Sequence, residues 1–271
     1  MFSPSELAAN YADIGIKKAA FPVWKLIMSG AIAGFFVGMG SAVSNMAVHS
    51  IDNVSVSRII CGLLFPFGLG MVMLLGAELF LGNSMIFISV LEKKVSVGGM
   101  FRNWGCVYLG NFTGAVLLAA ACAFFGHLNY SDGGLAVYTI KVAAAKCSIS
   151  FLDALVMGIC CNLLVCTAVL CSLSATDTAG KIIGAYIPIA YFVICGFENS
   201  VANMYYIAAG LFAMGIPSYA ADAIKMNIYT DLLTWPGFLL RNLLPVSIGN
   251  IIGGIGISLF MWLNYLKNTS K

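Results

Sequence analysis

The chain has 271 residues, of which 61% are hydrophobic and only 9% are charged, and its net charge is +3. A water-soluble domain carries roughly 25% charged residues, so the composition excludes a soluble protein and predicts one surrounded by lipid. The small positive charge is dispersed, which excludes a nucleic-acid-binding surface. The nine cysteines include no C-x-x-C pair and lie mostly in apolar runs, where cysteine packs as a small hydrophobic residue.

The N-terminal segment is predicted to form a short helix outside the membrane. Ser3, Pro4 and Glu6 give the start pattern of a helix, with a capping hydroxyl, a proline in the first turn and an acidic residue that completes a capping box. Lys17 and Lys18 fall at the other end, where positive charge opposes the helix dipole. We expect an amphipathic helix lying in the plane of the membrane surface.

Six apolar runs follow, and each is long enough for the about 20 residues of a transmembrane helix. They are Trp24–Val48, Ile59–Val90, Val107–Phe125, Ala154–Leu173, Ile182–Phe212 and Leu239–Leu266. The second and fifth exceed one span and contain glutamate, asparagine and glycine, so both are predicted to be interrupted. The sequence therefore predicts an all-α integral membrane protein with six transmembrane helices, of which helices two and five are broken.

The distribution of lysine and arginine predicts the orientation. Six spans place both termini on one side, and that side holds nine of the 14 basic residues. These nine are Lys17, Lys18, Lys25, Lys93, Lys94, Arg102, Lys181, Lys267 and Lys271. The other five are Arg58, Lys141, Lys146, Lys225 and Arg241. We expect a multi-pass protein of the cell inner (plasma) membrane with both termini in the cytoplasm.

Two motifs occur in the same order in each half of the chain. G-x-E-x-x-x-x-N occurs at Gly76–Asn83 and at Gly196–Asn203, and G-N-x-x-G occurs at Gly110–Gly114 and at Gly249–Gly253. With three spans per half, the second half crosses the membrane upside down relative to the first, which is the inverted-repeat architecture of many channels and transporters. The predicted organisation is a single channel domain over 1–271, with a cytoplasmic amphipathic helix at 1–20, a first repeat at 24–126 and an inverted second repeat at 153–266.

Glu78 and Glu198 are the carboxylates inside apolar runs. A charge in mid-membrane is costly, so it normally faces protein or water and marks function. A broken helix also frees backbone N–H groups, and those at the start of a half-helix attract an anion. Two uses of the glutamates stay open: they hold the loops in shape by accepting backbone hydrogen bonds, or they contact the solute or relay a proton.

Polar and small residues inside the spans give two further predictions. Gly30, Gly34 and Gly38 are spaced by four and predict a face of the first span that packs closely on another helix. Asn162 lies four residues after Gly158, at mid-membrane depth. Its amide either forms an interhelical hydrogen bond or is a donor to the pore.

Four motifs carry a resemblance to a known family. They are G-A-E-L-F-x-G-N at Gly76–Asn83, G-F-E-N-S-V-A-N-M at Gly196–Met204, N-W-x-x-V-Y-x-G-N-x-x-G-A at Asn103–Ala115 and N-L-x-P-V-x-x-G-N-x-x-G-G at Asn242–Gly254. Together they resemble the formate/nitrite transporter family, over essentially the whole chain. The resemblance implies an aquaporin-like protomer with a pore of its own, assembly as a homopentamer, and transport of small monovalent anions or their acids.

The resemblance also implies site residues. The pore constriction would consist of Phe65, Leu69 and Phe192. Asn162 and Asn199 would line the central chamber, and the loops of the two broken spans that surround it contribute Glu78, Leu81, Gly82, Asn83 and Glu198. By the resemblance, Lys146 would lie in the extracellular vestibule. Lys17 and Lys18 are predicted at the opposite mouth because they are basic residues in an otherwise charge-poor chain. An apolar constriction forces an anion to shed water, and basic residues at the mouths raise the local anion concentration.

Two residues depart from the pattern of family members with formate or nitrite activity. Those members usually have histidine directly after the glutamate of span five, where this chain has Asn199, and threonine or serine where it has Leu81. Asparagine can donate a hydrogen bond but is not protonated near neutral pH. The hydrosulfide channels of the family resemble this pattern best, so a passive channel that prefers hydrosulfide (HS⁻) is expected.

Three other functions are alternatives to a passive anion channel. A formate/nitrite transporter with proton coupling is the alternative nearest to it, and Asn199 argues against that coupling. A water or glycerol pore of the aquaporin type would show paired Asn-Pro-Ala loops, and a membrane enzyme would show a titratable cluster or a cofactor motif. The sequence contains neither, so it predicts a protein that is not an enzyme and needs no cofactor and no metal.

Overall fold

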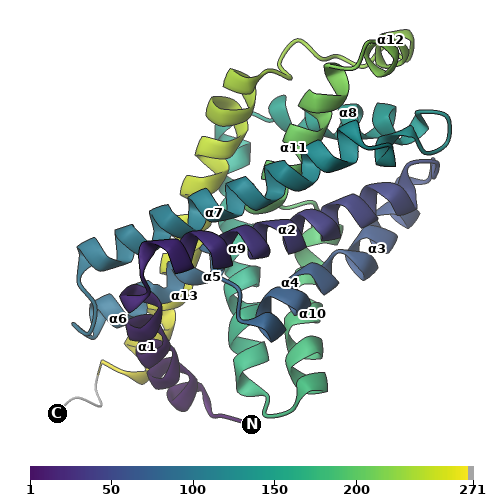
Figure 1. The fold of residues 1–271 in the computed structure, drawn as a ribbon. Helices are drawn as coiled ribbons and strands as arrows, with labels where there is room; N and C mark the ends of the chain where they lie inside the picture. Colours follow the sequence, from purple (N-terminus) through teal and green to yellow (C-terminus); the bar gives the residue numbers. More distant parts are fainter. Residues whose placement is uncertain (268–271) are drawn as a thin grey trace.

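The computed structural model describes residues 1–267, so Lys271 lies outside the described residues. Helix α1 (Pro4–Ala20) begins as the sequence predicts. The Ser3 hydroxyl accepts the Glu6 N–H, and the Glu6 carboxylate accepts the Ser3 N–H at 2.7 Å. Helix α1 and the end of the described chain, after α13, lie at the same end of the molecule, and α12 lies at the opposite end (Figure 1).

The helices of the two halves follow the predicted order. The first half contains α2 (Val23–Val48), α3 (Val54–Leu64), α4 (Pro66–Leu75), α5 (Phe80–Asn83), η1 (Ser84–Ile86), α6 (Phe87–Leu91) and α7 (Val97–Phe124). A short turn, η2 (His127–Asn129), leads into the second half. That half contains α8 (Gly134–Cys147), α9 (Phe151–Ser174), α10 (Thr178–Cys195), α11 (Ser200–Met214), α12 (Pro217–Lys225), the π-helical turn η3 (Gly237–Leu243) and α13 (Leu244–Tyr265).

Within residues 1–267, six helices are long and apolar enough to cross a membrane, which confirms the predicted number of spans. Spans two and five are broken at a glycine. Helix α4 ends at Gly76 with φ +66°, and α10 ends at Gly196 with φ +76°, a left-handed conformation that glycine adopts without strain. The chain then runs extended through Leu79 and Asn199 before the next half-helix begins. The prediction that both spans are discontinuous is confirmed.

The first and third spans of each half pack closely through glycines. A Cβ on Gly30 of α2 would lie 2.8 Å from the Val107 carbonyl of α7, and a Cβ on Gly34 would overlap the Asn111 backbone. Helices α9 and α13 repeat this contact, because a Cβ on Gly158 would lie 2.7 Å from the Val246 carbonyl. No side chain fits between these backbones. The predicted close-packing face of the first span is therefore present.

Helix α8 was not predicted, and it corresponds to α1. The two helices lie at opposite ends of the molecule (Figure 1), and each precedes the first span of its half. The repeat in the structure thus includes α1 and α8, which the predicted bounds of 24–126 and 153–266 leave out. We call the two ends of the molecule the α1 side and the α8 side.

Helix α1 packs on the protein itself. Its buried residues are Ala8, Tyr11, Ala12 and Gly15, and they face η1, α6 and α13. The sequence predicted that α1 is amphipathic and that its apolar face contacts the membrane surface. That face instead packs on the apolar side chains of the short helices that follow the first break. Helix α1 is therefore in a position to hold the loop of span two.

Candidate functional site: two symmetric ion-pair networks at broken helices

The break in span two is held by a four-residue network on the α1 side. The Lys18 ammonium donates to Glu78 Oε1 at 2.8 Å and to Asn83 Oδ1 at 2.9 Å. The Asn83 amide donates to Glu78 Oε2 at 2.6 Å and to Asn103 Oδ1 at 2.8 Å. Asn103 in turn donates to the Lys18 carbonyl at 2.9 Å. The network therefore joins α1, the broken span and α7.

The break in span five is held by the same network on the α8 side. The Lys146 ammonium donates to Glu198 Oε1 and Oε2, at 2.9 and 3.1 Å. The Asn203 amide donates to Glu198 Oε2 at 2.6 Å and to Asn242 Oδ1 at 2.8 Å, and Asn242 donates to the Lys146 carbonyl at 2.9 Å. This match, group by group, supports the inverted repeat far more strongly than the sequence motifs alone.

The two networks differ in the acceptors that the lysine uses. Asn83 Oδ1 accepts a hydrogen bond from Lys18, but the corresponding Asn203 Oδ1 is buried without a partner in the described part of the chain. Lys146 instead makes both of its contacts with Glu198. The α8-side network therefore has an acceptor free.

Both glutamates are buried as ion pairs. The Glu78 and Glu198 side chains are 5% and 6% exposed, and their lysine partners are 20% and 17% exposed. Of the two uses left open by the sequence, holding the loops fits these contacts, although the hydrogen-bond donors are lysine and asparagine side chains rather than backbone N–H groups. A buried carboxylate needs such a partner because its solvation by water is lost.

The asparagines of the G-N-x-x-G motifs clamp the breaks to neighbouring spans. Asn111 accepts the Phe80 N–H at 2.9 Å and donates to the carbonyls of Gly30 and Glu78, at 2.8 and 2.9 Å. These bonds satisfy backbone groups that the broken helix leaves free, as the membrane interior requires.

Asn250 does the same in the second half. It accepts the Ser200 N–H at 3.0 Å and donates to the carbonyls of Gly158 and Glu198, at 2.8 and 3.1 Å. The sequence supplied the repeated motif, but it did not indicate that its asparagines act on the breaks. The sequence did contain a pattern from which this role could have been inferred. Each asparagine lies between two glycines, and glycines allow another span to approach closely.

Asn199 caps α11. Its Oδ1 accepts the N–H groups of Val201 and Ala202 at 3.0 and 3.1 Å, and the residue is 5% exposed. The side-chain Nδ2 donates no hydrogen bond within residues 1–267. Asn199 therefore orients the start of α11 with one atom and keeps an N–H donor available with the other.

Asn162 uses its amide between helices. Its Nδ2 donates to the Leu81 carbonyl at 3.2 Å, to Ser84 Oγ at 3.0 Å and to the Asn250 carbonyl at 2.5 Å. An amide nitrogen has two hydrogens, so these acceptors occupy it fully. Of the two alternatives, the interhelical hydrogen bond describes Asn162, and its nitrogen is not free to donate to an anion.

Leu81 and Gly82 lie in the short helix after the first break and are buried. The Tyr11 hydroxyl of α1 donates to the Gly82 carbonyl at 2.7 Å. Burial raises the pKa of Tyr11 well above its ordinary value, so the hydroxyl keeps its proton and remains a donor. Tyr11 was missed as a functional residue because its place on the apolar face of α1 indicated packing only.

We expect Tyr11→Phe to lower the free energy of unfolding by about 1–3 kcal/mol, because the buried Gly82 carbonyl loses its donor. The measurement is thermal unfolding of the purified protein followed by size-exclusion chromatography. Tyr229→Phe is the control, since Tyr229 is 61% exposed. Equal unfolding temperatures for both variants would show that the hydroxyl does not hold the loop.

The three predicted constriction residues lie close together. The rings of Phe65 and Phe192 meet edge to face with centroids 5.6 Å apart. Leu69 lies one helical turn after Phe65, and all three side chains are buried. Phe65 marks the junction of α3 and α4, where Pro66 begins the second helix. The structure thus provides an apolar closure between α4 and α10.

A cavity of about 290 Å³ opens on the α1 side of this closure. Its lining includes Lys17, Lys18, Leu69, Glu78, Gly82 and Asn83. The cavity therefore brings together both predicted vestibule lysines, three of the predicted loop residues and Leu69 of the constriction.

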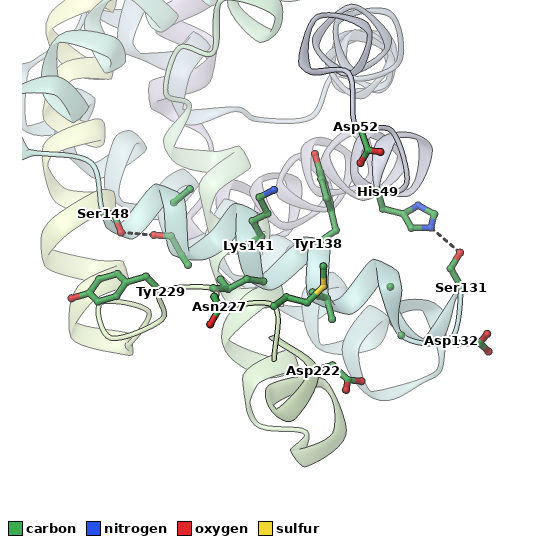
Figure 2. A pocket seen from close by; sticks show the side chains of 17 residues that line it. His49, Asp52, Ser131, Asp132, Tyr138, Lys141, Ser148, Asp222, Asn227 and Tyr229 are labelled. Carbon is green, nitrogen blue, oxygen red and sulfur yellow. Dashed lines mark hydrogen bonds between the residues drawn. The ribbon is translucent and has the colours of Figure 1, made fainter. Parts of the chain in front are cut away.

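A second, wider cavity of about 720 Å³ lies on the α8 side (Figure 2). Tyr138 and Lys141 of α8 line it together with His49 and Asp52 from the end of span one. His49 Nε2 is hydrogen-bonded to Ser131 Oγ at 2.8 Å. In the part of the chain that the structure describes, no group of three or more histidine, cysteine, aspartate or glutamate side chains could hold a metal ion.

The lysines differ in how much charge they present to an anion. Lys18 and Lys146 are 2.8 and 2.9 Å from carboxylates, which offset much of their fields. Lys17 is exposed beside the α1-side cavity and forms no ion pair within residues 1–267. The expectation that Lys18 and Lys146 attract anions by a free charge therefore does not fit their contacts, and Lys17 is better placed for that role.

Comparison with known proteins identifies the family. The formate/nitrite transporter family model matches residues 5–264. The chain belongs to the formate/nitrite transporter family. Family membership confirms the resemblance drawn from the four motifs and makes the chain a member of a family of membrane channels and transporters.

Relatives match over nearly the whole chain. The uncharacterized transporter YrhG of Bacillus subtilis is 36% identical over 97% of this chain and 94% of its own length. The formate channel FocA of Escherichia coli K12 is 30% identical over 97% of this chain and 94% of its own. The formate channel BtFdhC of Bacillus thuringiensis is 33% identical over 93% and 91%.

Solved structures have the same fold as this chain. A pentameric formate channel with formate bound has a TM-score of 0.77 and 29% identity, covering 90% of this chain and 98% of its own. An FNT family ion channel has a TM-score of 0.78 and 28% identity, covering 97% of each chain. The predicted fold, six helices in two inverted repeats with helices two and five broken, is confirmed.

Proposed function

We propose that the protein is a passive channel for formate and similarly small monovalent anions in the cell inner membrane, assembled as a homopentamer with one pore in each protomer. The observation that carries the proposal is the pair of ion-pair networks, which hold two broken helices on either side of the Phe65–Phe192 contact. Broken helices in a membrane persist only against protein or a water-filled cavity. The channel is not an enzyme in this proposal.

The proposed substrate differs from the hydrosulfide expected from Asn199 and Leu81. Two of the relatives described above are named formate channels, and one structural neighbour is a formate channel with formate bound. None of these names supports a hydrosulfide preference. The free Nδ2 of Asn199 is compatible with formate, since an amide N–H donates well to a carboxylate oxygen.

The proposed path crosses the apolar contact between the two cavities. An anion loses most of its water at the constriction of Phe65, Leu69 and Phe192, and this loss sets the barrier. Asn199 replaces part of the lost hydration by donating a hydrogen bond, although it cannot donate a proton. Because Asn199 cannot protonate the substrate, the substrate should cross as the anion. The flux should then show no pH dependence with the pKa of a histidine.

The α1 side is proposed to face the cytoplasm. Both ends of the described chain lie on that side (Figure 1), as do Lys17, Lys18 and Lys94. An excess of basic residues near the spans marks the cytoplasmic side of membrane proteins.

Flux into proteoliposomes tests the proposal. Formate, nitrite and hydrosulfide are compared side by side at several membrane voltages, with empty liposomes as the control. We expect formate to pass fastest and its flux to follow voltage. Faster passage of hydrosulfide would restore the preference suggested by Asn199 and Leu81. Passage of glycerol without passage of any anion would contradict the proposal.

We expect Asn199→His to shift preference toward formate and to introduce a dependence of flux on pH between about 5 and 8, where histidine titrates. Asn199→Gln is the matched control, because it keeps the amide and adds no titratable group. The measurement is formate and hydrosulfide flux across that pH range. An equal loss of flux for every anion would mean that Asn199 serves only to cap α11.

A further inference from the structure

Arg58 is a basic side chain that neither network uses. It lies on α3, in the second turn after the Asn53 cap. Its guanidinium lies over Gly196, because a Cβ on that glycine would lie 3.1 Å from Nη1 and 3.4 Å from Nη2. Gly196 begins the break of span five and stands two residues before Glu198. Arg58 therefore adjoins the start of the α8-side loop.

Tyr138 relates Arg58 to the α8-side cavity, because it lines that cavity and feels the charge of Arg58. Tyr138 lines this cavity with Lys141, and Figure 2 shows both side chains extending from α8 into it. Burial raises the pKa of Tyr138, and the charge of Arg58 acts on it in the opposite direction, as a cation near the phenol does. The Tyr138 phenol, which lines the cavity, thus lies within electrostatic reach of the guanidinium that covers Gly196.

No group in the described part of the chain accepts a hydrogen bond from Arg58. Within residues 1–267 it forms no ion pair and no hydrogen bond, although a guanidinium carries five N–H donors. An arginine that serves only to anchor a helix in headgroups extends toward the membrane surface. Arg58 instead turns onto a glycine backbone and remains exposed. Its donors are therefore available to a ligand that arrives from the α8 side.

Arg58 also lies on the route to the constriction. It precedes Phe65 by seven residues on the same run of helix, which is about 10 Å along the axis at 1.5 Å per residue. Gly196, which it contacts, is one helical turn beyond Phe192 on α10. The guanidinium therefore stands on the α8 side of the closure that an anion has to cross.

We propose that Arg58 and Tyr138 form an anion-binding subsite on the α8 side of the Phe65–Phe192 constriction, and that this subsite selects a planar carboxylate such as formate. The inference rests on the proposed function and refines its substrate class. A guanidinium presents two parallel N–H groups that match the two oxygens of a carboxylate. Hydrosulfide has a single sulfur and can accept only at one point, so it gains less from Arg58.

The subsite belongs to one side of the channel only. Gly76 is the glycine of span two that corresponds to Gly196, and a Cβ on Gly76 would have no atom within 4 Å. No side chain of the described residues therefore covers Gly76 as Arg58 covers Gly196. Anions arriving from the α8 side should depend on Arg58, and those arriving from the α1 side should not.

Planar-bilayer recordings test this inference with formate added to one side at a time. We expect Arg58→Gln to raise the half-saturating formate concentration about tenfold from one side only, as the loss of a charge-assisted hydrogen bond predicts. Arg58→Lys should fall between Arg58→Gln and the wild type for formate. The half-saturating hydrosulfide concentration should change much less in both variants. Lys141→Gln, a matched loss of charge beside the same cavity, should shift formate and hydrosulfide alike, and by much less than Arg58→Gln shifts formate.

Other results would overturn the inference. An equal shift in Lys141→Gln would mean that general surface charge acts, and a shift that appears only with anionic lipid in the bilayer would mean that Arg58 holds a lipid phosphate. If Arg58→Gln does not assemble, Arg58→Lys carries the test, and wild-type behaviour of that variant toward formate counts against the subsite. Formate currents unchanged in Arg58→Gln would leave the proposed function intact, whereas a wild type that conducts no formate would remove both.

Discussion

Lys146→Met is expected to lower the free energy of unfolding by about 3–5 kcal/mol, because it leaves the Glu198 carboxylate buried without its cation. Glu198 is 5% exposed, and Lys146 contacts both of its oxygens. Without the ammonium, the carboxylate has to take up a proton or draw in water, and either change moves the loop that positions Asn199. We therefore expect conduction to fall with stability.

The matched variant in the other half is Lys18→Met, which strips the cation from Glu78. Because the two networks correspond group by group, it should be destabilising to a similar degree. Lys141→Met is the control, since Lys141 is exposed and forms no ion pair within residues 1–267. The measurements are chemical unfolding in detergent and formate flux in liposomes.

A double variant separates the ion pair from other effects. Lys146→Met combined with Glu198→Gln removes both charges, and replacing a whole buried pair is often neutral while removing one partner is not. We expect the double variant to recover most of the lost stability. A double variant as unstable as Lys146→Met alone would mean that the ion pair is not the source of the effect.

Much of the fold followed from the sequence because lipid imposes simple rules. The apolar runs had to be helices, since a backbone in lipid has to satisfy its own hydrogen bonds. The motifs around Glu78 and Glu198 placed the breaks correctly, because a charge flanked by glycine does not continue an apolar helix. Helix α8 was missed, since its 14 residues are too short to span and carry Lys141 and Lys146.

The site was less predictable because its bonds join residues far apart in the chain. Glu78 and Asn83 lie in one motif, and their hydrogen bond could be inferred from the spacing. The lysine partner of Glu78 is 60 residues away, and that of Glu198 is 52 residues away. Only the packing of α1 and α8 against the breaks creates those pairs. The packing of the spans also provides the interhelical acceptors of Asn162. From the sequence alone, a hydrogen bond between helices and a pore role for Asn162 could not be distinguished.

Phe192→Ala is expected to raise formate flux about tenfold, which corresponds to a barrier lower by about 1.4 kcal/mol. The Phe65 and Phe192 rings touch edge to face, so removing one ring opens the apolar closure and lets an anion keep more of its water. The same opening should admit larger carboxylates such as lactate. The measurement is the flux ratio of formate to lactate in liposomes.

Controls for this variant have to separate the pore from the packing. Truncating a buried phenylalanine can cost about 3–5 kcal/mol of stability. Phe192→Leu is a milder variant that makes a smaller opening, and it should also raise formate flux. Phe67→Ala is the matched control, because Phe67 is 56% exposed and its ring meets Tyr186 edge to face. If Phe192→Ala and Leu69→Ala both keep wild-type flux and selectivity, the barrier lies elsewhere. If Phe67→Ala raises flux as much as Phe192→Ala, loosened packing rather than the Phe65–Phe192 contact controls passage.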